Sequence, residues 1–111
     1  MSRHDEAVYL RHMLDFSVEA MALLRGKGRT DLDSDRTLNL AVVRLLELIG
    51  EAAHRVSPET RNRFGDIPWR QVVSMRNHLI HGYDAIDFDI VWQVVQEDLP
   101  HLANSLRRVL E

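Results

Sequence analysis

The sequence predicts an all-α fold, a compact bundle of four to five helices in one domain covering residues 1–111. Apolar residues recur every three or four positions over most of the chain, which is the spacing of one face of an α-helix. Caps, prolines and glycines separate these stretches at helix-like lengths. No segment alternates apolar and polar residues as a half-buried strand does. A chain of 111 residues is also near the usual size of one domain.

Two long helices are expected in the first half of the chain. The first covers residues 5–25, and Gly26-Lys27-Gly28 ends it. The second covers residues 35–56, after an acidic loop at 30–34 in which Asp33 and Ser34 are candidate N-caps. Its apolar surface is wider than a solvent-facing helix needs, which indicates that it packs against more than one neighbour. The residues that define the two apolar faces are Leu10, Leu14, Val18, Met21 and Leu24, then Leu38, Val42, Leu45, Ile49, Ala53 and Val56.

Three further helices are expected in the second half. Ser57-Pro58-Glu59 is a helix start, with a hydroxyl cap and proline at the first helical position, and this short helix ends at Phe64-Gly65. Pro68 opens a fourth helix that runs towards Gly82. Asp87 caps the last one, in which Pro100 predicts a kink or break near Asp98, because proline cannot donate a backbone hydrogen bond.

Composition excludes several classes of protein. The chain has no cysteine, so disulfide frameworks, thiolate zinc sites and cysteine nucleophiles are excluded. The charged N-terminus lacks the pattern of a signal peptide and no stretch has the pattern of a membrane span, so we expect a cytoplasmic location. The net charge of −3 argues against broad nucleic-acid binding, which needs a basic face. Any contact with RNA would have to be local.

The segment from Arg76 to Tyr83 carries the candidate chemistry. If the fourth helix continues through it, Asn77 and His81 stand at i and i+4 on one face, where the amide can orient the imidazole. A long arginine at Arg76 reaches the volume beside that ring. Arginine binds phosphate oxygens through a planar set of donors, and histidine transfers protons near neutral pH. Attack of a ribose 2′-hydroxyl on its neighbouring phosphate needs those two services and no metal.

The same segment, Arg76-Asn77-His78-Leu79-Ile80-His81-Gly82-Tyr83, resembles the R-x4-H-x-Y motif of the HEPN superfamily in the form found in HepT-like toxins. The similarity extends over nearly the whole chain. It includes Ala41-Val42-Val43-Arg44 through Ile49-Gly50-Glu51-Ala52-Ala53, and also Ser57-Pro58-Glu59, Ile67-Pro68-Trp69 and Asp98-Leu99-Pro100.

The resemblance implies a metal-independent endoribonuclease without a cofactor. It implies a two-fold homodimer that brings two copies of the motif into one cleft, where two Arg76 side chains make a local positive focus. Arg76 would stabilise the phosphate in the transition state and His81 would act in proton transfer. Asn77 would orient His81, and Tyr83 would contact RNA.

The resemblance also implies regulation by a partner. HepT-like toxins are paired with a small nucleotidyltransferase antitoxin that adenylylates the motif tyrosine, here Tyr83. An AMP phosphodiester on that residue would place an anion beside Arg76 and His81, in the position meant for the RNA phosphate.

Other interpretations of the sequence remain open. The chain can be a non-catalytic HEPN module that binds a nucleotide or the partner, or a structural bundle that only oligomerises. Glu51-Ala52-Ala53-His54 has the Glu-x-x-His spacing of di-iron bundles, but the second copy that such sites need is degenerate. We therefore expect no metal, and interpret Glu51 as an ion-pair partner of Arg76 or Arg44.

Overall fold

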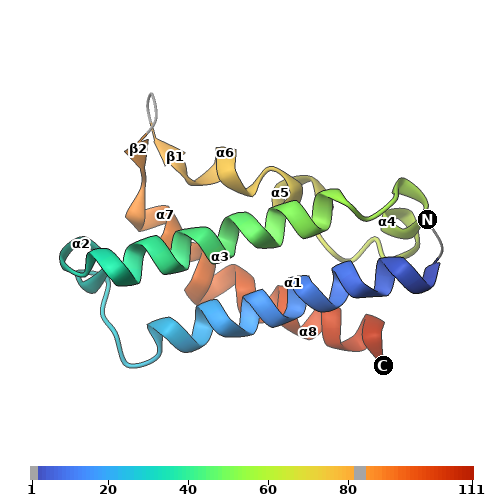
Figure 1. The fold of residues 1–111 in the computed structure, drawn as a ribbon, viewed down its shortest axis with the longest axis horizontal. Coiled ribbons are helices and arrows are strands. Elements are labelled where there is room, and N and C mark those ends of the chain that lie inside the picture. Colours follow the sequence, from blue (N-terminus) through green and yellow to red (C-terminus); the bar gives the residue numbers. More distant parts are fainter. Residues whose placement is uncertain (1–2, 82–84) are drawn as a thin grey trace.

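The computed structural model describes residues 3–81 and 85–111 and confirms the all-α bundle. Helices α1 (Arg3–Leu24) and α3 (Arg36–His54) are the long elements, and they run antiparallel to each other (Figure 1). Gly26 ends α1 with a φ of 76°, a left-handed conformation that glycine adopts without strain. The expected stop at this glycine is confirmed.

The connection between these helices differs from the prediction. The expected loop at 30–34 contains a helical turn, α2 (Asp31–Ser34). The N-cap of α3 is Asp35 rather than Asp33 or Ser34, and its carboxylate accepts a hydrogen bond from the amide of Leu38. Asp35 has an extended backbone, as an N-cap requires, whereas Asp33 and Ser34 are already helical.

Helix α4 (Pro58–Arg63) begins as predicted, with the Ser57 side chain accepting from the amide of Thr60. The buried carboxylate of Glu6 joins α1 to the first turn of α4. It accepts hydrogen bonds from the Ser57 amide at 2.6 Å and from the Thr60 hydroxyl. These hydrogen bonds, that of Thr60 first, hold the pKa of the Glu6 carboxyl below its ordinary value. One carboxylate therefore fixes the start of α4 against α1.

The predicted fourth helix is two short helices, α5 (Trp69–Val73) and α6 (Met75–Leu79), separated at Ser74. It does not continue to Gly82. Ile80 has an extended backbone and begins β1 (Ile80–His81), which pairs antiparallel with β2 (Ala85–Ile86). The Leu79 carbonyl accepts from the amide of Asp87 at 2.8 Å. The residues after α6 therefore pair with a later segment of the chain instead of forming a further helical turn.

The last helical segment begins as predicted. Asp87 caps α7 (Phe88–Gln93) through hydrogen bonds from the next amides to its side chain. A π-helix, η1 (Val94–Asp98), then precedes α8 (Leu99–Leu110), which has proline in its first turn. The helix does not break near Asp98, because Asp98 and Leu99 both keep a helical backbone; a π-helical turn stands where a kink or break was expected. Pro100 has no amide hydrogen, so the preceding turn widens where the regular pattern cannot continue.

Helix α3 is the centre of the bundle. It packs against α1 on one side and against α5 and α6 on the other, while α8 covers α1 from a further side (Figure 1). Its completely buried residues are Val42, Leu46, Ile49 and Ala53. The prediction that this helix has more than one neighbour is confirmed. No helix in the described part of the chain combines the length and apolarity needed to cross a membrane.

Candidate functional site

The motif residues lie on α6 and in the hairpin that follows it. Met75 and Leu79 are buried and fix α6 to the core, and between them Arg76 and Asn77 are exposed. The structure describes His81 by its backbone in β1, and Tyr83 lies outside the described residues. Because α6 ends at Leu79, the prediction that Asn77 and His81 share one helical face is wrong.

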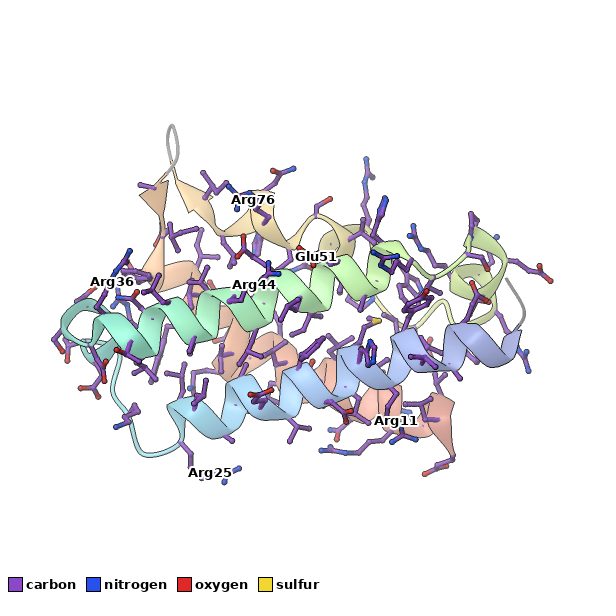
Figure 2. All side chains as sticks on the ribbon, viewed as in Figure 1. Arg11, Arg25, Arg36, Arg44, Glu51 and Arg76 are labelled. Atoms are coloured by element: carbon purple, nitrogen blue, oxygen red, sulfur yellow. The ribbon has the colours of Figure 1, made fainter. Side chains whose placement is uncertain are left out.

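Arg76 makes a close ion pair with Glu47 of α3. Its Nη1 lies 2.6 Å from Glu47 Oε2. The side chain of Glu47 is 18% exposed, whereas that of Arg76 is 64% exposed, so the carboxylate lies at the base of the pair and the guanidinium faces solvent. Figure 2 shows Arg76 on the same side of α3 as Arg44 and Glu51. Glu47 of α3 therefore sets the position of the candidate catalytic arginine on α6.

Gly50 permits this arrangement. A Cβ at this position would lie 3.0 Å from the Val72 carbonyl oxygen and 3.2 Å from Met75 Cβ, both closer than ordinary van der Waals contact. Only glycine lets α3 approach the junction of α5 and α6 so closely. Gly50 lies one helical turn from Glu47 along α3, so that approach brings α6, and with it Arg76, within reach of Glu47.

A groove of about 460 Å³ lies between α3 and the α5–α6 segment. Two carboxylates and three basic side chains surround it, and its lining residues are Glu47, Gly50, Glu51, His54, Arg55, Val73 and Arg76. Arg44 beside it pairs with Glu51 at 3.3 Å. The prediction that Glu51 pairs with an arginine is confirmed for Arg44, while Arg76 has Glu47 instead.

Asn77 lines a different groove. That groove has a volume of about 650 Å³ and is lined by Pro68, Trp69, Arg70, Gln71, Ser74, Asn77 and His78. Arg76 does not line it. Within the described part of one chain, the two motif residues of α6 therefore face separate grooves.

The groove at Arg76 is suited to an anion more than to a metal ion. An exposed guanidinium has N–H donors in a plane that matches phosphate oxygens. Glu51 and His54 both line the groove, but no group of three or more potential ligands for a metal occurs among the side chains that the structure describes.

The sequence pattern gave a partial indication of Glu47. Arg44, Glu47 and Glu51 are spaced as a polar stripe on one helix. Periodicity shows that they share a face, but it does not show which carboxylate an arginine from a distant segment meets. The distance in sequence between Arg76 and Glu47 is 29 residues, and only packing closes it.

Comparison with known proteins identifies the family. The model of the family described as ribonuclease HepT-like matches residues 10–109. The chain belongs to the ribonuclease HepT-like family. The resemblance noted on Arg76 to Tyr83 is therefore confirmed at the level of the family, which is HEPN-like.

Several relatives align over most of this HepT-like chain. It is 30% identical over 109 residues to "Putative RNase MJ1380" of Methanocaldococcus jannaschii, covering 98% of this chain and 100% of the relative. It is 31% identical over 103 residues to "Putative RNase TTE0752" of Caldanaerobacter subterraneus subsp. tengcongensis, covering 93% and 92%. It is 35% identical over 79 residues to "Probable ribonuclease HepT" of Thermococcus cleftensis, covering 71% and 72%. No solved structure matches the chain significantly. The names of all three relatives describe ribonucleases.

Proposed function

We propose that this chain is a metal-independent endoribonuclease and the toxin of a type VII HepT/nucleotidyltransferase toxin–antitoxin pair. The match to the ribonuclease HepT-like family over residues 10–109 carries the proposal. The exposed guanidinium of Arg76 supports it, because this is the group that the reaction needs for the phosphate. The substrate is RNA, and the protein partner is the cognate nucleotidyltransferase.

The proposed reaction is an internal transesterification. The 2′-oxygen of a ribose forms a bond to the adjacent phosphorus, and the bond from phosphorus to the 5′-oxygen of the next nucleotide breaks. His81 moves the proton that leaves the 2′-hydroxyl or the one that reaches the 5′-oxygen. Arg76 neutralises the charge that grows on the non-bridging oxygens. The products are a 2′,3′-cyclic phosphate and a 5′-hydroxyl, and no metal takes part.

The functional unit that we propose is a two-fold homodimer. One chain supplies one Arg76 and one His81, and its Asn77 faces another groove than its Arg76. A second copy would place two Arg76 and two His81 side chains at one cleft. This would double the cationic groups there in a protein that is acidic overall. In this arrangement Asn77 orients His81, either of its own chain or of the partner subunit, and Tyr83 contacts RNA.

Silencing by adenylylation of Tyr83 follows from the same chemistry. An AMP group joined to the tyrosine oxygen carries one negative charge in its phosphodiester. That charge would bind Arg76 in place of the RNA phosphate. The nucleotidyltransferase forms the bond from the tyrosine oxygen to the α-phosphorus of ATP, and pyrophosphate leaves.

The test compares purified parent protein with Arg76→Ala and His81→Ala on single-stranded RNA. Each variant is expected to lose about 100-fold or more of kcat, since each removes a group that acts in the transition state. Arg107→Ala is the control, because Arg107 lies on α8 and bonds only locally to Asn104. EDTA is expected to leave the rate unchanged. Full activity of both Arg76→Ala and His81→Ala would rule out the nuclease assignment, and strong inhibition by EDTA would rule out metal independence.

Adenylylation is tested by mass. Incubation with ATP and the cognate nucleotidyltransferase is expected to add AMP to the parent and to Tyr9→Phe, but not to Tyr83→Phe. Continued addition to Tyr83→Phe would place the modified residue elsewhere in the chain.

A further inference from the structure

Glu47 has no role in the proposed reaction, yet it holds the side chain on which that reaction depends. We infer that Glu47 is a positioning residue, which orients the guanidinium of Arg76 to receive the RNA phosphate. This inference rests on the proposed function, because it assigns Glu47 a part in the reaction attributed to Arg76.

The contact geometry supports positioning. Nη1 of Arg76 donates a hydrogen bond to Oε2 of Glu47 at 2.6 Å. A guanidinium has five N–H donors in a rigid plane, so one engaged donor restricts the orientations of that plane and leaves the other donors for a phosphate. With 64% of its side chain exposed, Arg76 keeps that remaining edge accessible.

The carboxylate is better fixed than the arginine that it holds. Glu47 is 18% exposed and projects from α3, the central helix of the bundle. Arg76 stands on a helix of five residues and, without a partner, would exchange among many rotamers. If this side chain became ordered only during the reaction, the loss of its conformational entropy would offset much of the electrostatic stabilisation that its charge provides. The ion pair orders it beforehand, through a carboxylate on the central helix of the bundle.

The second acid of the groove does not serve this purpose. Glu51 stands one turn further along α3, and its carboxylate pairs with Arg44 of the same helix at 3.3 Å. Both side chains of that pair are more than half exposed, so its contribution is expected to be small. Glu51 is therefore a matched control: it is the same residue type on the same helix and in the same groove, but it has another partner.

Competition between Glu47 and the RNA phosphate for Arg76 would change kcat in the opposite direction. If Glu47 instead competed with the phosphate for Arg76, removing the carboxylate would free the arginine. RNA would then bind more tightly and the reaction would become faster. A positioning role predicts a slower reaction, so the sign of the change in kcat separates the two.

The experiment measures kcat and KM on single-stranded RNA for the parent, Glu47→Ala, Glu47→Gln and Glu51→Ala. Glu47→Ala is expected to lose about 10- to 30-fold of kcat, the range that corresponds to the rotamer entropy of one arginine. Glu47→Gln keeps the shape without the charge and should lose less. KM should change by less than about three-fold, and Glu51→Ala should stay within about two-fold of the parent in both constants. Urea unfolding confirms that all four proteins are folded in the assay.

A double variant links the effect to Arg76. In an Arg76→Lys background, which keeps the charge but not the planar donors, Glu47→Ala should change kcat by less than about two-fold. A loss as large as in the parent would overturn the inference, as would an unchanged or higher kcat for Glu47→Ala alone. An equal loss from Glu51→Ala would also overturn it. If the parent itself cleaves no RNA, both the proposed function and the role of Glu47 are wrong. If the parent cleaves and Glu47→Ala matches it, only the role of Glu47 fails.

Discussion

Replacing Gly50 with alanine tests whether the close approach of α3 to the α5–α6 junction positions the site. The added methyl would lie 3.0 Å from the Val72 carbonyl oxygen and 3.2 Å from Met75 Cβ. The first of these neighbours is backbone and the second is the root of a buried side chain, so neither can rotate away. The two segments must therefore move apart by a few tenths of an ångström.

Two effects of opposite sign set the magnitude. Inserting a methyl group into a packed contact costs about 1–3 kcal/mol. Alanine in the middle of a helix is in turn favoured over glycine by about 0.5–1 kcal/mol. The net loss in the free energy of unfolding is therefore about 0–2.5 kcal/mol, and a loss in the upper half of that range lowers the Tm by several degrees in a domain of this size. Because Met75 precedes Arg76, the movement should also lengthen the contact between Arg76 and Glu47 and lower kcat.

Urea unfolding and RNA cleavage are measured on Gly50→Ala, with Gly65→Ala as the control. A Cβ at Gly65 would meet the Asn62 carbonyl oxygen at 3.8 Å, an ordinary contact, so that variant should match the parent in stability and activity. If Gly50→Ala is more stable than the parent, the packing argument is refuted. The higher helix propensity of alanine would then outweigh any cost of the added methyl group. Loss of stability with unchanged kcat would show that the contact does not position Arg76.

Three further predictions concern assembly, pH and capping. Co-expressed Arg76→Ala and His81→Ala chains should form mixed dimers that cleave RNA well above either variant alone, and activity no higher than that of the variants would argue against a shared cleft. The pKa of Glu6 is held below its ordinary value of 4.5, so its contribution to stability is complete above that pH and is lost as pH falls through the lower folded pKa. Glu6→Gln should therefore lose more stability at pH 7 than at pH 3 in thermal unfolding, and an equal loss at both would exclude this linkage. Asp87→Ala removes the N-cap of α7 and should cost about 1 kcal/mol in urea unfolding, while Asp89→Asn, which keeps the capping residue, should cost less.

Local signals predicted most of the fold. The stop at Gly26, the cap at Ser57, the cap at Asp87 and the irregular turn before Pro100 each depend on the conformational limits of one or two residues. Such limits act wherever the residue occurs, so they can be recognised without knowledge of the fold. The same holds for α3, whose wide apolar surface indicated burial between several neighbours.

The end of α6 could not be predicted in this way. Leu79 and Ile80 fit a helical pattern, and the first local stop signal, Gly82, comes two residues after Ile80. The hydrogen bond from the Asp87 amide to the Leu79 carbonyl and the pairing of β1 with β2 end it, and both come from a segment several residues further on. The predicted pairing of Asn77 with His81 depended on that missing turn.

The sequence by itself determined the helical class, the order of the long helices and the presence of the motif from Arg76 to Tyr83, because these depend on periodicity, caps and residue identity. The tertiary structure decided that Arg76 meets Glu47 and not Glu51, and that Asn77 faces another groove. The physical reason is the distance of closest approach between helices, which Gly50 sets by having no side chain. A stripe of acids offers several partners to an arginine, and packing selects one of them.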